Sequence, residues 1–214
     1  MQKVVCLHIP KTAGTSLKSS LATAYGKQLS ADKSENRNMW STFLNVPFSD
    51  FRYTGIEKRC RCLMGHFPIR KYSFLKSKGW KFITWLRDPA SRIISYYDFL
   101  RNRNLQDSKI KLRPDVAKII DNVDVVEFSS MLTGIYKEYL EDLSMLDFIG
   151  FTESYSNDVK RLKKVLGVKL KGHFTRNVTK GPRTKITGIM LKQIKENQWE
   201  DYKTYVDAKQ IDRF

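Results

Sequence analysis

A lysine, a glycine and three hydroxyl side chains lie together in the segment Lys11–Ser16 (KTAGTS), which follows the apolar run Val4–Ile9 (VVCLHI) and a proline. Backbone N–H groups in a loop between a strand and a helix, with the positive end of the helix dipole, can bind a phosphate group. Lys11 adds a positive charge, and Thr15 and Ser16 add hydroxyl donors. The segment is therefore predicted to be an anion-binding loop; the alternative is an ordinary polar turn with a helix cap.

The order of residues in this loop does not fit the nucleotide-kinase pattern. That pattern, G-x-x-x-x-G-K-[ST], places its lysine directly after the second glycine. In this chain Lys11 precedes Gly14. The loop is therefore predicted to bind phosphate without being of the Walker type, and a kinase-like phosphotransferase, which would also need Mg²⁺, is a rival hypothesis.

A second anion-binding candidate lies at the end of the apolar run Lys81–Leu86 (KFITWL), where the chain continues as Arg-Asp-Pro. Ligands of open α/β sheets bind at the carboxyl ends of the strands, and the forked guanidinium group suits phosphate oxygens. Arg87 is therefore predicted to bind an anionic ligand. The alternative for Arg87, and also for Arg92, is a structural ion pair with Asp88 or Asp98.

One of the three histidines, His66, lies just after the strand candidate Arg61–Met64. An imidazole changes its protonation near neutral pH and can act as a general base. A lone histidine is more often a packed or surface residue, and that is the alternative here. The predicted position of His66 at the same strand edge as Lys11 and Arg87 favours the general base, whereas His8, inside a predicted strand, is interpreted as structural.

These candidates all follow predicted strands. Short apolar runs predict strands at Val4–Ile9, Arg61–Met64, Lys81–Leu86 and Leu146–Phe151. Strands that alternate with helices favour a mainly parallel central sheet flanked by helices, the α/β class. A chain of 214 residues is long enough for one large core and short for two, so residues 1–214 are predicted to form a single domain.

Helical spacing of apolar residues predicts the helices between these strands. The first helix should start in the anion-binding loop, capped by Thr15 or Ser16, and end at Gly26. The last helix should run without a break from Ile186 past Val206, with its apolar side chains on one broad face. Further helices are expected at 93–100 and 157–166. Residues 27–58 are interpreted as an insertion.

The charge balance predicts an anionic partner. The chain carries 39 Lys and Arg residues against 22 Asp and Glu, a formal charge of +17, which suits a nucleotide, a nucleic acid, an acidic membrane or an acidic sugar. A non-catalytic module that binds nucleic acid or another anion is therefore a second rival hypothesis. Such a module has no need of Lys11, His66 and Arg87 at one strand edge, which makes nucleic acid the weaker prediction.

The sequence shows no pattern typical of a disulfide framework, a metal site or a targeting segment. The three cysteines form no pattern typical of a disulfide framework and are interpreted as reduced thiols. No cluster of His, Cys and carboxylate residues has the spacing of metal ligands, so no metal is expected. The sequence lacks a run of about 18 apolar residues and a secretory signal at its start. These features predict a cytoplasmic protein without a membrane span.

The quoted motifs resemble those of sulfotransferases that use 3′-phosphoadenosine 5′-phosphosulfate (PAPS). The segment Lys11–Leu17 (KTAGTSL) resembles the family's 5′-phosphosulfate loop, and the segment from Arg87 through Ser95 to Tyr97 resembles its 3′-phosphate site. The Gly-His at His66 resembles the motif of heparan sulfate 2-O-sulfotransferases, in which that histidine acts as base. The closest resemblance is to this heparan sulfate and uronyl 2-O branch.

This resemblance implies transfer of a sulfuryl group from PAPS to a hydroxyl acceptor, most naturally an acidic or neutral glycan, with adenosine 3′,5′-bisphosphate (PAP) as the other product. It implies that His66 is the general base and that Lys11 stabilises the leaving phosphate. A basic segment before the last helix would close over the nucleotide, a solvated loop being the alternative. The implied donor-binding residues are Lys11, Thr12, Ala13, Gly14, Thr15, Ser16, Arg87, Ser95, Lys180, Arg183 and Lys185.

Overall fold

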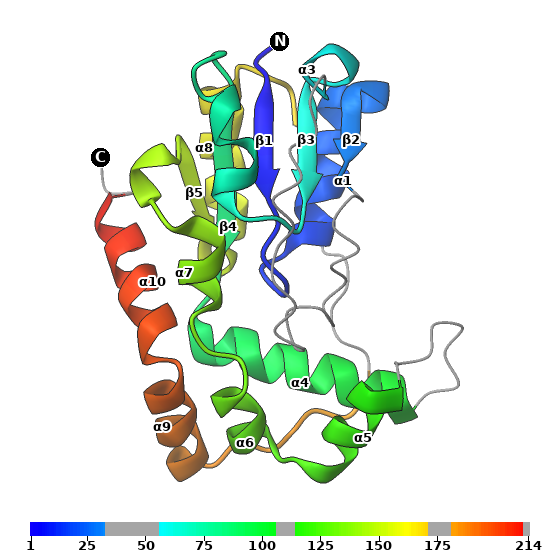
Figure 1. Ribbon diagram of the computed structural model, residues 1–214, viewed down its shortest axis with the longest axis vertical. Coiled ribbons are helices and arrows are strands. Elements are labelled where there is room, and N and C mark those ends of the chain that lie inside the picture. The colour runs from blue at the N-terminus through cyan, green and yellow to red at the C-terminus, as the bar shows by residue number, and fades with distance from the viewer. Residues whose placement is uncertain (33–55, 106–113, 171–180, 212–214) are drawn as a thin grey trace.

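The computed structural model describes residues 1–32, 56–105, 114–170 and 181–211. At its centre is a five-stranded sheet with the strand order β2-β3-β1-β4-β5 (Figure 1). All neighbouring strands in it are parallel, so the predicted α/β class and parallel sheet are confirmed. The strands are β1 (Val4–Leu7), β2 (Leu29–Ala31), β3 (Cys62–Gly65), β4 (Lys81–Leu86) and β5 (Phe148–Phe151).

Helices cover both faces of this sheet (Figure 1). On one face α1 and α8 pack against inward side chains such as Cys6, Met64 and Trp85. The second core lies on the other face, around Leu7 and Leu63, and continues into the helices from α4 to α7, α9 and α10. The helices are α1 (Gly14–Tyr25), α3 (Ile56–Arg59), α4 (Pro89–Leu105), α5 (Pro114–Asn122), α6 (Val125–Ser130), α7 (Ile135–Leu140), α8 (Tyr155–Leu166), α9 (Gly188–Asn197) and α10 (Trp199–Ile211).

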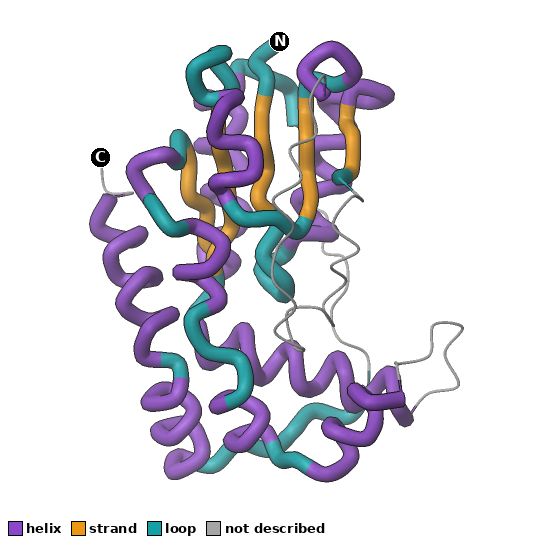
Figure 2. The backbone as a smooth tube through the Cα atoms, in the orientation of Figure 1, coloured by secondary structure: helices purple, strands orange, loops and turns teal. Residues whose placement is uncertain are grey.

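The carboxyl ends of the strands meet at one edge of the sheet. β1 and β3 end at paired residues, Leu7 and Gly65, and β4 runs two residues past Thr84, the partner of Leu7. Figure 2 shows the strands toward one end of the molecule and helices alone at the other, and the strand arrows in Figure 1 point toward α4. The residues that directly follow β1, β3 and β4 are therefore brought together, as the sequence predicts.

The start of the first helix differs from the prediction. α1 begins at Gly14, and its N-cap is Ala13 in the left-handed conformation, with no side chain capping it. Thr15 and Ser16 lie inside the first turn, so the prediction that one of them caps the helix is wrong. The reason is that Ala13, in its left-handed conformation, already turns the backbone into the helix before Thr15. The predicted end at Gly26, with φ of 50°, is confirmed.

The single last helix predicted from Ile186 is also wrong, because the chain forms two helices that meet at Gln198. Gln198 is fully buried, and its side-chain amide donates to the carbonyl oxygens of Ser129 and Leu132 at 2.7 and 3.1 Å. The break changes which side chains face the core. Trp199 is 63% exposed, whereas the sequence pattern places it on the apolar face.

Part of the predicted insertion at 27–58 belongs to the sheet. β2 pairs with β3 through Leu29, Ser30 and Ala31. The sequence analysis missed this strand because it is only three residues long and has a polar residue at its centre. The other described parts of the insertion are a 3₁₀ turn at Gly26–Gln28 and the short helix α3. Its aromatic residues between 33 and 55 lie outside the described residues. Of the helices described, none is long and apolar enough to cross a membrane.

Candidate active site

The anion-binding loop leaves β1 and turns sharply into α1. Lys11 and Ala13 both have left-handed backbones, with φ of 70° and 63°. This conformation costs a non-glycine residue about 1–2 kcal/mol, and such strain is concentrated at ligand sites. Thr12 stabilises the turn, because its hydroxyl donates to the carbonyl oxygen of Ile9 at 2.8 Å. Left-handed residues within a loop direct neighbouring N–H groups into an anion-binding concavity, which agrees with the predicted role.

Lys11 lies in a cluster of cations. Its ammonium group is 4.2 Å from the ring centroid of Phe99 in α4, and the guanidinium of Arg103 is 4.4 Å from the same centroid. The pKa of Lys11 is lowered to about 8, mainly by burial and in addition by the charges of Arg87 and Arg103, while Asp98 partly opposes the shift. A phosphate group placed among these cations would relieve their repulsion, so the cluster is suited to a strongly anionic ligand.

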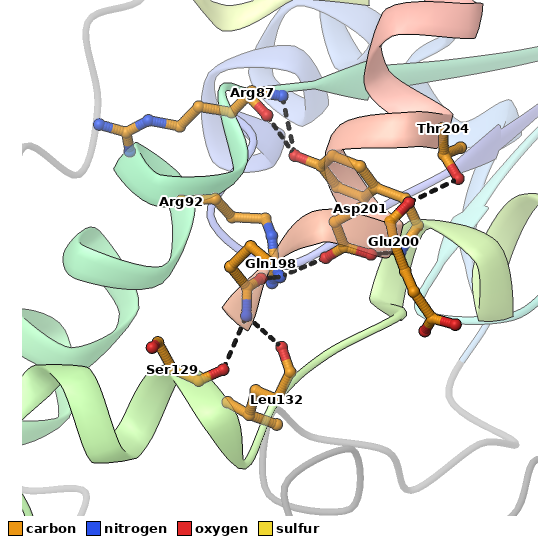
Figure 3. Close-up of polar contacts among 9 residues, drawn as sticks. Arg87, Arg92, Ser129, Leu132, Gln198, Glu200, Asp201 and Thr204 are labelled. Carbon is orange, nitrogen blue, oxygen red and sulfur yellow. Dashed lines mark hydrogen bonds and ion pairs between the residues drawn. The ribbon is translucent and has the colours of Figure 1, made fainter. Parts of the chain in front are cut away.

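Arg87 directly follows β4, and its peptide group is fixed while its guanidinium is not. The Tyr136 hydroxyl accepts from the Arg87 N–H at 3.1 Å and donates to the Arg87 carbonyl oxygen. Across the described ranges no carboxylate pairs with the guanidinium, which points away from Arg92, Gln198 and Asp201 in Figure 3. The alternative of a structural ion pair for Arg87 therefore finds no support.

The two carboxylates considered for that ion pair are used elsewhere. Asp88 accepts from the Ser91 N–H at 2.8 Å and from the Tyr202 hydroxyl at 2.7 Å. Asp98 accepts from the N–H and the hydroxyl of Thr184, at 3.0 and 2.7 Å. Neither carboxylate is thus directed at Arg87, which leaves the guanidinium available for a ligand.

Arg92 does form the structural ion pair that the sequence analysis gave as its alternative, but with a different partner. Its guanidinium is 2.8 Å from the Asp201 carboxylate, and both side chains are fully buried. Asp88 and Asp98, the predicted partners, are close in sequence, whereas Asp201 comes from α10 at the far end of the chain. Sequence spacing gives no signal for such a pair.

His66 meets the requirements of a general base. Its Nδ1 is 2.6 Å from the carbonyl oxygen of His8. A carbonyl oxygen only accepts hydrogen bonds, so we assign the proton to Nδ1, which leaves Nε2 of the neutral ring as an acceptor. Burial lowers the pKa of His66 below 6.5, partly opposed by the bond to His8. The ring is therefore neutral, and able to accept a proton, at neutral pH.

His8 contacts both the base and the anion-binding loop. Its ring stacks on that of His66, with 4.3 Å between centroids and 29° between planes. On the other side, a Cβ added at Gly14 would lie only 1.6 Å from Nε2 of His8. Gly14 is thus required because the His8 ring occupies the space next to it. The sequence analysis assigned His8 only a structural role and missed this contact, because stacking depends on strand register.

The basic segment before α9 is anchored to α4 on both sides of Arg183. Besides the bonds from Thr184 to Asp98, the Asn102 amide donates to the Pro182 carbonyl oxygen at 3.0 Å. Arg183 itself is exposed. Burial lowers the pKa of Arg87, Glu153, Tyr136 and Asp88 oppose this shift, and the charge of Arg183 adds a smaller lowering. The sequence analysis missed Asp98 and Asn102 as anchors.

The remaining predicted donor residues have different positions. Ser95 lies in α4, partly buried, and no hydrogen bond of its hydroxyl is found in the described parts of the chain. Lys185 is exposed in the anchored segment. Lys180 lies outside the described residues. The ranges that the structure describes contain no group of three or more His, Cys, Asp or Glu residues that could hold a metal ion.

The residues at the end of β5 make contacts that join it to β4 and to the segment after β4. Thr152 donates its hydroxyl to the Leu86 carbonyl oxygen at 3.0 Å, and Glu153 accepts from the Asp88 N–H at 2.7 Å. A Cβ at Gly150 would lie 2.2 Å from the Trp85 ring. The segment for which the sequence left a structural or adenine-binding role open therefore packs β5 against β4.

Comparison with known proteins identifies the family. Residues 1–211 match the model of the sulfotransferase family. The chain belongs to the sulfotransferase family. The predicted enzyme class is thereby confirmed, and sulfotransferases of this family take PAPS as the donor. The resemblance to the 2-O branch is not tested by this match.

Solved structures of sulfotransferases resemble this sulfotransferase at low sequence identity. A mouse sulfotransferase, SULT7A1, in complex with PAP is 13% identical, with a TM-score of 0.41, and the alignment covers 94% of this chain and 66% of the mouse chain. A sulfotransferase from Alicyclobacillus acidocaldarius is 11% identical, with a TM-score of 0.48, and the alignment covers 100% of this chain and 96% of that chain. No curated protein matches the sequence.

Proposed function

We propose that this sulfotransferase moves a sulfuryl group from PAPS to a hydroxyl group of a carbohydrate. The observation that carries the proposal is the arrangement at one edge of the sheet, where three different chemical requirements are met. The Lys11 loop is shaped for an anion, the neutral His66 ring has Nε2 free to accept a proton, and the Arg87 guanidinium is available for a phosphate. A phosphotransferase or a simple anion-binding module would not need all three.

The donor would be held at both of its ends. Lys11 and the loop from Thr12 to Ser16 would bind the 5′-phosphosulfate, and Arg87 with Ser95 would bind the 3′-phosphate. Support for an added contact from Arg183 comes from the anchored segment on both sides of it and from the effect of its charge on Arg87. Lys180 and Lys185 stay candidates for the same phosphate.

The reaction needs one proton transfer and one exchange of bonds at sulfur. The acceptor oxygen attacks sulfur and forms the new S–O bond, while its proton passes to Nε2 of His66. The bond between sulfur and the 5′-phosphate oxygen breaks, and its electron pair stays on that oxygen. Lys11 and the loop N–H groups stabilise the charge that builds there, the kind of electrostatic stabilisation that usually contributes most to catalysis.

For the acceptor, we infer a hydroxyl on an acidic sugar of the uronyl or heparan sulfate type. Two observations support this choice over a neutral acceptor. The Gly-His motif at His66 resembles that of the heparan sulfate 2-O enzymes, and the formal charge of +17 favours an anionic substrate. Incubation with radiolabelled PAPS and a panel of uronate-containing glycans, neutral glycans, phenols and aliphatic alcohols tests it. Label transferred only to a phenol or an aliphatic alcohol would contradict it.

A thermal-shift titration tests the donor assignment. PAP at about 100 times its Kd should stabilise the fold by roughly 2.7 kcal/mol, because a ligand that binds only the folded state shifts the folding equilibrium. Adenosine 5′-phosphate, which lacks the 3′-phosphate, should stabilise it much less at the same concentration. Equal or greater stabilisation by ATP with Mg²⁺ would instead support the rival phosphotransferase.

A further inference from the structure

The peptide group of Arg87 lies where the sheet no longer supplies hydrogen-bond partners. Strand pairing between β4 and β5 ends at Leu86, whose partner is Phe151. The next N–H and C=O groups, those of Arg87, are both bonded to a single side chain, the Tyr136 hydroxyl. This hydroxyl accepts one hydrogen bond and donates the other. It therefore fixes the backbone of Arg87 from both sides, at the point from which the side chain leaves.

Asp201, Arg92 and Gln198 form a buried polar network (Figure 3), and this network holds Tyr136. Its backbone N–H donates to Asp201 Oδ1 at 2.8 Å, and the other oxygen of this carboxylate pairs with Arg92. The Arg92 guanidinium also lies 5.2 Å from the Tyr136 ring centroid and donates to Gln198 Oε1 at 3.2 Å. One carboxylate of α10 thus fixes both a cation of α4 and the start of α7.

A buried ion pair such as Arg92–Asp201 is weak evidence for a gain in folding stability, so the network is better explained by the backbone that it holds in place. Taking two charges out of water is costly, and replacing a buried ion pair by packed apolar side chains often leaves stability unchanged or raises it. Arg92 and Asp201 have side chains that are 1% and 0% exposed. The network links α4, α7 and α10 to the backbone of Arg87 through Tyr136. It thereby fixes the point from which the Arg87 side chain leaves the backbone.

We propose that Tyr136 is a positioning residue for recognition of the 3′-phosphate, acting through its two hydrogen bonds to the Arg87 peptide. The proposal rests on the proposed function in one respect, namely that Arg87 binds the 3′-phosphate. Tyr136 is fully buried and donates its only hydroxyl proton to the Arg87 carbonyl oxygen, which places it behind Arg87 and not in the ligand site. Loss of the hydroxyl should therefore weaken binding only of ligands that carry the 3′-phosphate.

The test compares Tyr136→Phe with Tyr25→Phe, a matched control. Tyr25 also donates its hydroxyl to a backbone carbonyl, that of Gln2 at 2.8 Å, but this contact joins the end of α1 to the segment before β1. Calorimetry should give a Kd for PAP about tenfold higher in Tyr136→Phe, equivalent to about 1.4 kcal/mol, and less than about twofold higher in Tyr25→Phe. The Kd for adenosine 5′-phosphate should be unchanged in both variants.

A double-mutant cycle with Arg87→Ala decides whether the effect runs through Arg87. In the Arg87→Ala background, Tyr136→Phe should not raise the Kd for PAP any further. Equal losses for PAP and adenosine 5′-phosphate, or additive losses in the double variant, would overturn the positioning role. If Arg87→Ala itself leaves the Kd for PAP unchanged, the proposed 3′-phosphate site fails instead, so the two failures are distinguishable.

A second variant covers the outcome in which Tyr136→Phe does not fold. Asp201→Glu keeps the charge opposite Arg92 but moves the carboxylate that holds the Tyr136 N–H. It should raise the Kd for PAP by a few-fold and leave that for adenosine 5′-phosphate unchanged. An unchanged ratio of these two Kd values would overturn the proposal. At saturating donor, kcat of either folded variant should stay within about threefold of the wild type, since the group that accepts the proton is untouched.

Discussion

The two sides of the candidate site are held in different ways. His66 is positioned by strand pairing, because β1 and β3 run in register and bring it to the carbonyl oxygen and ring of His8. Arg87 is positioned by side chains, through Tyr136 and the buried carboxylate of Asp201. The difference indicates that the proposed base depends on the sheet itself, whereas the proposed 3′-phosphate site depends on the helices α7 and α10, which come after the sheet residue Arg87 in the sequence.

The largest expected effect is on the strand side. His66→Ala should lower kcat by about 10²–10⁴-fold, since a general base contributes in the transition state, while the Kd for PAP stays near that of the wild type. Because burial lowers the pKa of His66, the acid limb of the wild-type rate should lie below pH 6.5. Steady-state kinetics against pH, with calorimetry for PAP, provides the measurement. A variant that keeps most of its turnover would show that the base is another group.

On the helical side, the largest effect should be on stability. Asp201→Ala leaves the Arg92 guanidinium buried without its counter-ion, so the free energy of unfolding should fall by about 3–5 kcal/mol. Denaturant unfolding measures this value. Asp207→Ala, an exposed carboxylate on the same helix, is the control and should change it by less than about 0.5 kcal/mol. Similar losses of unfolding free energy in both variants would show that the loss does not come from leaving the Arg92 charge unpaired.

A third variant tests whether the anion-binding loop and the base are coupled through His8. Gly14→Ala should lower the single-turnover rate by about 10–100-fold, because the new methyl group displaces the His8 ring and with it His66. In a His8→Ala background the same substitution should have little further effect. Gly188→Ala, at a helix start with no atom within 4 Å of the added Cβ, is the control and should leave the rate unchanged.

Additive effects of Gly14→Ala and His8→Ala would contradict this coupling. They would mean that each residue acts on the site separately, and that the stacked rings do not transmit a displacement. Gly14 and His8 would then affect the rate independently, and not through one stacked arrangement with His66.

The smallest expected effect is the pH dependence of PAP binding that Lys11 causes. Its pKa of about 8 means that it loses its proton as the pH rises through that value, and the site then loses a positive charge. The Kd for PAP should therefore rise as the pH increases from about 7 to about 9, by about tenfold at most. The phosphate groups do not change charge in this range, since their second pKa is about 6.

Lys11→Arg provides the control for this titration, because a guanidinium stays protonated throughout the range. Its Kd for PAP should not vary between about pH 7 and about pH 9, whatever its absolute value. Calorimetry in buffers of matched ionic strength gives both curves. The same pH dependence in the wild type and in Lys11→Arg would assign the titration to another group.

Much of the site was predictable from the sequence because it depends on short-range patterns. Apolar runs that end in polar turns predicted β1, β3, β4 and β5, and parallel strands necessarily bring their carboxyl ends to one edge. The residue types just past those ends, Lys11, His66 and Arg87, then indicated anion binding and proton transfer. Their common position follows from the geometry of a parallel sheet. The pattern of apolar runs was enough to predict the strands of that sheet.

Only the tertiary structure decided how these side chains are held. Nothing in the spacing of Tyr136, Arg92 and Asp201 predicts that they meet, because buried polar partners are chosen by three-dimensional packing and not by period. The same holds for the break at Gln198, which is stabilised by backbone carbonyl groups at and just after the end of α6. The sequence by itself determined which groups reach the edge of the sheet, and the packing of the helices determined which of them are left free to bind.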